Sequence, residues 1–335
     1  MWTFFIGEAL AKGLLILFPR RFTNRIRDNT QDMEVLVLRT GQLKSKPKMT
    51  FIEGVFATIL FDLALFGTTN SFIKFIIRIF THLQNSWDKP FPSSEVAKTE
   101  IQEFCQRLSI QQAPWIWELP IHEYKCLNDF FSRAYAPMYH PTLGSDRIVA
   151  PACCTLTRFN DDASMTRILI KGCNYRIEDI GLQPIDDIDQ YKKNYAILGY
   201  LSPTDYHRVH SPMEGKCIHL SLEGRDTRSA SVKFWSGGFN ILNDNKRLVV
   251  VIEASTGLRL ALVIIGGIGV DTITYNANML GKHVSKGQEI STFRAGGSAI
   301  AMFTSQPIQL TSSFSEASNN GMPVEVLVGE SIANY

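Results

Sequence analysis

The chain has 335 residues, of which 45% are hydrophobic and 20% charged, and its formal net charge is +2. This composition is typical of a globular protein with a substantial core, long enough for one large domain or two smaller ones. The small net charge, without a block of Lys and Arg, argues against nucleic acid as a partner. The six cysteines form no Cys-x-x-Cys pair, so we expect reduced thiols.

The N-terminal part is rich in Phe, Ile and Leu at helical spacing. In residues 72–83 the polar side chains Lys74, Arg78 and His82 recur every fourth position. Such a helix has a narrow basic stripe and a wide apolar face, which suits a membrane interface; the alternative is a helix buried in a protein core. No stretch reaches about 18 uncharged apolar residues, so no membrane-spanning helix is predicted. We expect residues 1–94 to form a helical, membrane-associating region, peripheral or monotopic on a cytosol-facing surface.

The rest of the chain, residues 95–335, is predicted to begin with helices and continue as β structure. One helix is expected over residues 95–108, capped by Ser93 or Ser94, and another over residues 121–134. From residue 148 onward, short β-rich runs alternate with Gly, Pro, Asn and Asp. The clearest predicted strands are residues 247–254, 258–265 and 324–328. The expected fold class is α+β, with a β-rich catalytic domain of mainly antiparallel sheets.

The densest group of ionisable side chains is Asp205, His207, Arg208 and His210. In an extended segment alternate residues share a face, so the two histidines would point to opposite sides and serve different partners. Histidine is the usual general acid or base near neutral pH, although two structural histidines in a polar turn remain the alternative. A zinc site would need a second well-spaced pair of ligands, and none is evident, so no metal is predicted.

A second candidate is Ser298, which follows Gly296 and Gly297 and precedes an apolar run ending at Phe303. Glycine permits unusual backbone dihedrals, but a serine becomes a nucleophile only beside a base. Read alone, this stretch is an ordinary turn before a buried strand.

Taken together and in chain order, these segments resemble the phosphatidylserine decarboxylase family, in the form with Gly-Gly-Ser at the processing site. The resemblance covers about two-thirds of the chain. It is carried by residues 120–133 with their Phe-Phe-x-Arg ending, Ile-Lys-Gly at 170–172, Asp-Tyr-His-Arg-Val-His-Ser-Pro at 205–212, Asn-Lys-Arg at 245–247, Lys-Gly at 286–287 and Gly-Ser at 297–298.

The resemblance implies a self-processing lyase that converts phosphatidylserine to phosphatidylethanolamine. Ser298 would attack the carbonyl of Gly297, and elimination would leave a large chain, 1–297, and a small chain, 298–335, that begins with a pyruvoyl group formed from Ser298. His210 would be the base in self-cleavage, and His207 would serve decarboxylation or reprotonation. The pyruvoyl group acts as an electron sink, so no external cofactor is implied. The implied partners are a phospholipid substrate, a membrane surface and the chain's own small fragment, with a homodimer as a further expectation.

The chain departs from the family at Cys153. The family's Pro-Ala-Asp segment corresponds to Pro-Ala-Cys at residues 151–153, so a thiol stands where an aspartate that orients the histidine is expected. Loss of that carboxylate from a serine–histidine system costs several orders of magnitude in rate.

Several outcomes follow from this departure. Asp205, or else Asp161 or Asp162, supplies the charge; or processing proceeds slowly on His210 alone; or the protein is an unprocessed, inactive lipid-binding relative. A decarboxylase of a soluble amino acid is another alternative. The wide apolar faces of the helices predicted in the N-terminal part argue against it.

Overall fold

The computed structural model describes residues 32–47, 86–108, 110, 116–139, 142–159, 167–170, 173–176, 181–182, 185–191, 196–202, 204–224, 245–266, 273–294 and 298–335. The predicted apolar helices within residues 51–83 lie outside these ranges, as do Asp161, Asp162 and Gly297.

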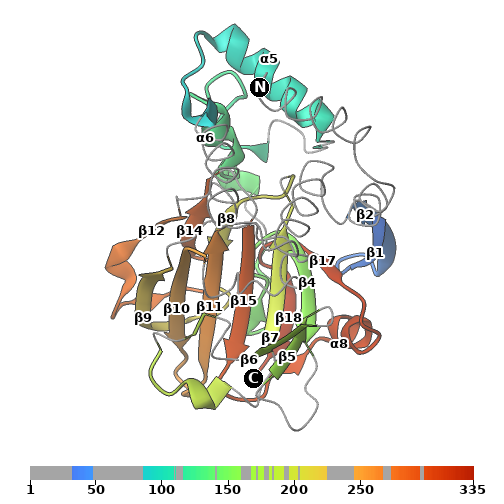
Figure 1. Ribbon diagram of the computed structural model, residues 1–335, viewed down its shortest axis with the longest axis vertical. Coiled ribbons are helices and arrows are strands. Elements are labelled where there is room, and N and C mark those ends of the chain that lie inside the picture. The colour runs from blue at the N-terminus through green and yellow to red at the C-terminus, as the bar shows by residue number, and fades with distance from the viewer. Residues whose placement is uncertain are drawn as a thin grey trace, which may run out of the picture.

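One large sheet dominates the described part of the chain (Figure 1). Its ten strands lie side by side in the order β13 (His283–Val284), β9 (Gly215–Glu223), β10 (Arg247–Glu253), β11 (Arg259–Gly266), β15 (Ser298–Thr304), β7 (Ala196–Leu201), β4 (Cys154–Phe159), β17 (Val324–Val326), β1 (Asp32–Val37) and β2 (Gln42–Pro47). All neighbouring pairs in this sheet are antiparallel except β1 and β17.

Smaller elements surround the large sheet. Three short sheets consist of β12 (Ile273–Tyr275), β14 (Glu289–Phe293) and β8 (Arg208–His210); of β16 (Gln309–Leu310), β18 (Ser331–Asn334) and β3 (Ile148–Val149); and of β5 (Arg167–Ile170) and β6 (Cys173–Arg176). The α-helices are α5 (Ser94–Arg107), α6 (Leu127–Phe131) and α8 (Ser312–Asn319). The 3-10 turns are η1 (Ser86–Asp88), η3 (Pro137–Tyr139), η5 (Ile188–Tyr191) and η7 (Ala277–Met279). In Figure 1, α5 and α6 lie above the upper end of the large sheet, on the side where the short sheet of β8 and β14 is drawn.

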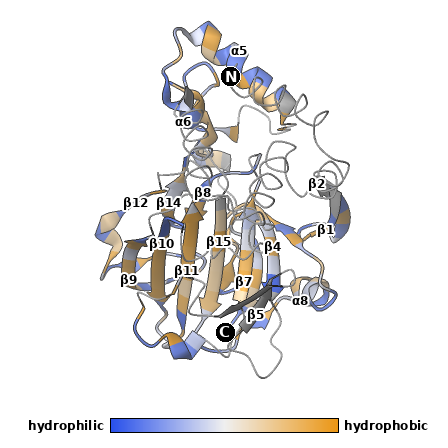
Figure 2. Ribbon diagram, viewed as in Figure 1, coloured by the Kyte–Doolittle hydropathy of each residue, from blue (hydrophilic) through white to orange (hydrophobic). Residues whose placement is uncertain are grey.

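The middle strands form the core of the sheet. The apolar residues of β10 and β11 are buried along almost their whole length, and Figure 2 shows these strands and β15 as hydrophobic. Their side chains are mostly Val, Ile and Leu, the residues that pack well on a pleated surface covered on both sides. The expectation of an α+β fold with mainly antiparallel sheets is confirmed for the described residues.

The predicted strands at 247–254, 258–265 and 324–328 appear as β10, β11 and β17, and helix 95–108 appears as α5. Ser93 caps α5, since its hydroxyl accepts a hydrogen bond from the Val96 N–H at 3.3 Å. The second helix is much shorter than expected. The chain turns at Pro120, whose carbonyl accepts from Glu123, and α6 begins only after Cys126, whose Sγ accepts from the Asp129 N–H.

Residues 32–47 form a β-hairpin, which corrects the helical expectation for this stretch of residues 1–94. Val35 and Val37 are buried, whereas Glu34 before them is exposed and Leu36 between them is only partly buried, an alternation that fits a strand with one covered face. Gly41 takes a φ of +65° in the turn between β1 and β2. The hairpin extends the large sheet at its edge (Figure 1). Among the helices of the described ranges, none is long and apolar enough to cross a membrane.

Candidate active site

Ser298 is the first residue of β15, a strand in the middle of the large sheet. It lies opposite Leu201, the last residue of β7, and opposite Gly266, the last residue of β11. The following residues, 299–303, are almost completely buried. The predicted buried strand after the Gly-Gly-Ser stretch is therefore confirmed. Ser298 lies at the end of the sheet where β7 and β11 end and β15 begins.

The end of β11 beside Ser298 is fixed by buried polar side chains. The Asn245 side-chain amide donates to the carbonyl of Gly266 at 2.6 Å, and the Arg247 guanidinium donates to the carbonyl of Gly181 at 3.2 Å. Both side chains are buried. The Asn-Lys-Arg motif thus holds the main chain next to Ser298.

The other neighbour of Ser298 leads directly to the histidines. After Leu201 the chain turns, and the Asp205 carboxylate accepts a hydrogen bond from the Ser202 N–H at 2.7 Å. The turn ends at His207, whose carbonyl accepts from the Phe293 N–H at 2.9 Å. Asp205 therefore stabilises the turn that connects Leu201, the strand partner of Ser298, to His207.

His207 is completely buried and holds one nitrogen free of hydrogen bonds. Its Nδ1 lies 2.8 Å from the main-chain oxygen of Asp205, which can only accept, so Nδ1 carries the proton and Nε2 carries the lone pair. Nε2 is buried without a hydrogen-bond partner. Burial, and after it the charge of Arg133, lower the pKa of His207 to about 3, so the ring is neutral at pH 7.

The Phe-Phe-x-Arg motif packs against this histidine. The ring of Phe131 lies 3.9 Å from that of His207, centroid to centroid. The buried guanidinium of Arg133 donates to the carbonyls of Phe130 and Phe131 at the end of α6 and to that of Thr204 in the turn. Arg133 thus links the end of helix α6 to the turn that precedes His207.

His210 has a hydrogen bond at each ring nitrogen. Nδ1 lies 2.9 Å from the carbonyl oxygen of Gly287, so Nδ1 carries the proton. Nε2 then accepts from the hydroxyl of Tyr206, at 3.1 Å. The two histidines therefore have different surroundings, as the alternation of the segment predicts.

Cys153 lies behind Tyr206. Its Sγ accepts from the Val328 N–H at 3.4 Å and lies 3.7 Å from the hydroxyl of Tyr135, whose ring stacks on that of Tyr206 at 4.3 Å. Burial raises the pKa of the Cys153 thiol to about 11, so it is neutral at pH 7. It does not supply the negative charge of the aspartate that it replaces.

Three participants were not assigned roles from the sequence: Arg133, Tyr206 and the Gly287 carbonyl. Each lies within a motif that the resemblance includes, so the signal was present. However, residue types do not reveal which main-chain carbonyl accepts a hydrogen bond, or that two residues 77 positions apart are bonded to each other.

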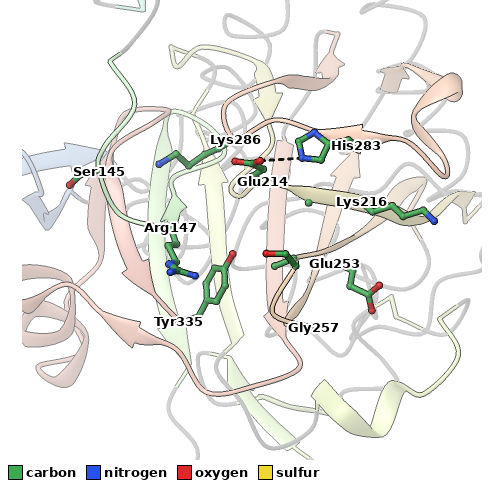
Figure 3. Close-up of a pocket in the computed structure, with 12 residues that line it drawn as sticks. Ser145, Arg147, Glu214, Lys216, Glu253, Gly257, His283, Lys286 and Tyr335 are labelled. Carbon is green, nitrogen blue, oxygen red and sulfur yellow. Dashed lines mark hydrogen bonds and ion pairs between the residues drawn. The ribbon is translucent and has the colours of Figure 1, made fainter.

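A separate open pocket of about 840 Å³ lies where β10 ends, at the opposite end of the sheet from Ser298 (Figure 3). Charged side chains line it, including Arg147, Lys216 and the pair His283–Glu214, with 3.2 Å between Nε2 and Oε1. Ser298 and the two candidate histidines do not line it. Within the described ranges, no three His, Cys, Asp or Glu residues are grouped so as to hold a metal ion.

Comparisons with known proteins identify the family of the chain. The sequence model of the phosphatidylserine decarboxylase family matches residues 127–334. A phosphatidylserine decarboxylase proenzyme of Halalkalibacterium halodurans is 27% identical over 269 residues, which cover 79% of this chain and 98% of the relative. Proenzymes of the same name from Clostridium kluyveri and Fusobacterium nucleatum are 29% and 23% identical, covering 72% and 91% of this chain and 81% and 99% of their own length.

These matches define the chain as an enzyme of the carboxy-lyase class. It belongs to the phosphatidylserine decarboxylase family.

Proposed function

We propose that this chain cleaves itself between Gly297 and Ser298 and then decarboxylates phosphatidylserine to phosphatidylethanolamine. The observation that carries the proposal is the position of Ser298: it begins the strand that lies against Leu201, and the turn after Leu201 leads to two buried histidines in different hydrogen-bonding states. Carboxy-lyase membership and the proenzyme relatives agree with it.

In self-cleavage, the Ser298 hydroxyl oxygen bonds to the carbonyl carbon of Gly297 and the peptide C–N bond breaks, which gives an ester. Elimination then removes the Cα proton of residue 298, breaks its Cβ–O bond and leaves Gly297 with a free carboxylate. The resulting dehydroalanine tautomerises to an imine, and water hydrolyses the imine to a pyruvoyl group and ammonia. Nε2 of His210 takes the hydroxyl proton at the first step, after the Tyr206 hydroxyl that donates to it rotates away, because Nδ1 already carries its proton toward Gly287.

His207 fits the later reaction. Its Nε2 lone pair is buried and unpaired, and a buried acceptor without a donor costs free energy unless an incoming group supplies one. Because the ring is neutral at pH 7, its Nε2 lone pair is available to a donor group of the substrate during decarboxylation. The pyruvoyl group, formed from Ser298, supplies the electron sink that the developing carbanion requires.

Strand pairing supports a small chain that stays bound after cleavage. β15 pairs with β11 and β7 along its whole length, β17 pairs with β4 and β1, and β18 pairs with β3. The fragment 298–335 would therefore contribute interior strands to sheets whose other strands belong to the large chain. We expect both fragments to elute together in native gel filtration and to separate only in denaturant.

The proposed organisation is a membrane-associating region within residues 1–94, apart from the hairpin at residues 32–47 that pairs into the large sheet, and a decarboxylase domain, residues 95–335. A phospholipid substrate stays in the bilayer, so the enzyme would work as a peripheral or monotopic protein at a membrane surface. The apolar sequence of residues 72–83 supports this location.

The test is carbon dioxide release from phosphatidylserine in vesicles and from free serine, with Ser298→Ala as the matched control. We expect the wild-type protein to act on the lipid at least about a hundredfold faster than on serine, and Ser298→Ala to release none. Equal rates on both substrates would contradict a phospholipid decarboxylase, and release by Ser298→Ala would contradict the role of Ser298.

A further inference from the structure

The two bonds to the ring of His210 suggest how this chain orients it without the expected carboxylate. One is donated by Nδ1 to the Gly287 carbonyl and the other is accepted by Nε2 from Tyr206. Either bond alone permits some rotation of the imidazole, whereas bonds at both nitrogens fix the ring plane and the tautomer.

We propose that the Tyr206 hydroxyl and the Gly287 carbonyl form a clamp that positions His210 in place of the carboxylate that Cys153 replaces. The proposal rests on the proposed function, in which His210 is the base of self-cleavage. Tyr206 and Gly287 are positioning residues that act through His210.

The Gly287 side of the clamp is built into a tight turn. The Gly287 N–H donates to the Ser211 carbonyl at 2.8 Å, and the Ser211 N–H donates to the Gln288 carbonyl at 2.7 Å. Lys286 ties the turn down, since its ammonium donates to the carbonyls of Gly144 and Asp146, at 2.8 Å each. The Gly287 carbonyl is thus fixed directly next to the segment that carries His210.

Glycine is required at this turn for two reasons. Gly287 has a φ of +79°, a region that other residues seldom adopt. A Cβ at this position would also lie 2.6 Å from a methyl carbon of Leu143. A larger residue would therefore strain the turn whose carbonyl holds His210 and would push the exposed side chain of Leu143 aside.

The Tyr206 side of the clamp is held by aromatic stacking. Its ring stacks on Tyr135, which in turn stacks on Trp117 at 5.6 Å, and Tyr206 is almost completely buried. Burial raises the pKa of Tyr206, so the hydroxyl keeps its proton and remains a donor. The rigid stack directs this donor at Nε2.

Charged groups near the clamp are paired with other groups. From β14, Glu289 pairs with Arg208 at 3.0 Å, and from the 285–288 turn the Lys286 ammonium is bonded to carbonyls. Cys153, which packs with Tyr206, is a neutral thiol. From the same segment, the Asp205 carboxylate accepts from the Ser202 N–H and lies close enough to Cys153 to act on it electrostatically. The Tyr206 hydroxyl and the Gly287 carbonyl are neutral dipoles, which hold a tautomer but stabilise an imidazolium less than a carboxylate does.

The first test is Tyr206→Phe, which keeps the stacked ring and removes the donor. We expect self-cleavage to slow about tenfold, and the acid limb of its rate–pH profile to move to higher pH. The direction follows because a donor to the Nε2 lone pair stabilises the neutral ring, so its removal favours protonation. Tyr135→Phe is the matched control, since it removes a hydroxyl one ring further from His210. Cleavage by Tyr206→Phe at the wild-type rate with an unchanged profile would overturn the proposal.

The second test is Gly287→Ala, which we expect to slow cleavage about tenfold or more. Gly281→Ala is its control, because Gly281 has nearly the same φ, +77°, but nothing within 4 Å of a Cβ. Adding Leu143→Ala should partly restore the rate of Gly287→Ala by making room for the methyl group. Equal slowing in the Gly281 and Gly287 variants would show that backbone strain, and not the clamp, is responsible.

A third measurement keeps the clamp testable if the wild-type protein does not cleave, which would count against the proposed function alone. Nitrogen NMR of ¹⁵N-histidine-labelled Ser298→Ala protein reports which ring nitrogen of His210 is protonated. We expect the proton on Nδ1 and a shift of the Nε2 signal in Ser298→Ala/Tyr206→Phe. A proton on Nε2, or no change on loss of the hydroxyl, would overturn the clamp.

Discussion

His207 and His210 are three residues apart and both are buried, yet their surroundings differ in kind. His207 has one hydrogen bond, to a main-chain oxygen, and an Nε2 atom without a partner. His210 has a partner at each nitrogen. Before any reaction, the Nε2 lone pair of His207 is open to a donor from an incoming molecule, whereas that of His210 is occupied by the Tyr206 hydroxyl of the same chain. The difference shows how one short segment can serve two successive reactions.

Loss of His210 should have the largest effect on self-cleavage. His210→Ala removes the proposed base, and general-base catalysis contributes on the order of a hundredfold to ten thousandfold, so we expect cleavage to slow about a thousandfold. The measurement is the disappearance of full-length chain on a denaturing gel over time. Cleavage at near the wild-type rate would remove the distinction between the two histidines.

Loss of His207 should mainly slow decarboxylation. We expect His207→Ala to cleave within about tenfold of the wild-type rate and to release carbon dioxide from phosphatidylserine on the order of a hundredfold more slowly. Both rates are measured on one preparation, so the ratio is independent of protein yield. Cleavage by His207→Ala about a thousandfold slower than wild type, with its processed fraction decarboxylating at the wild-type rate, would reverse the assignments.

The burial of His207 also predicts a pH dependence of stability. Its pKa is about 3 in the folded chain and about 6.5 when unfolded, so the unfolded chain binds more protons between these values. Stability is therefore lost as pH falls below about 6.5, by about 2 kcal/mol between pH 7 and pH 5.

The measurement is urea unfolding at both pH values in the uncleaved Ser298→Ala background. His207→Asn retains a side-chain donor for the Asp205 carbonyl but does not titrate, so its loss of stability should be smaller by about 2 kcal/mol. His122→Asn is the control, because the His122 side chain is 51% exposed. Identical pH dependence in the wild-type and His207→Asn proteins would show that His207 is not buried in its neutral form.

The smallest effect is expected at Cys153. The thiol is neutral and contacts Tyr135 and Val328, so Cys153→Ala should change the cleavage rate by less than about threefold. Cys154→Ala, one residue along and also buried, is the matched control for lost packing. A tenfold fall specific to Cys153→Ala would give the thiol a role in orienting His210 and weaken the clamp.

Local patterns predicted the central strands well. Runs of Val, Ile and Leu bounded by turn residues marked β10 and β11 within a residue or two, and serine before a helical pattern marked the start of α5. The alternation of residues 205–210 correctly separated the two histidines. These features depend on residues close together in the chain.

The remaining features depend on contacts that residue types do not encode. The hairpin of β1 and β2 is stabilised by pairing with β17, nearly 290 positions away. Helix α6 begins late because a cysteine acts as its N-cap, an unusual choice. The expectation that Asp205 supplies the missing charge stays a prediction. What residue types did not reveal is that the ring nitrogens of His210 are bonded to Tyr206 and to the main chain at Gly287.

The most direct test of the account is the intact mass of the purified protein after long incubation. We predict two chains that meet at Gly297 and Ser298, the smaller spanning residues 298–335 with a blocked amino terminus, and a single uncleaved chain for Ser298→Ala. A single full-length wild-type chain, unchanged with time, would contradict self-processing and leave an inactive lipid-binding relative as the better description.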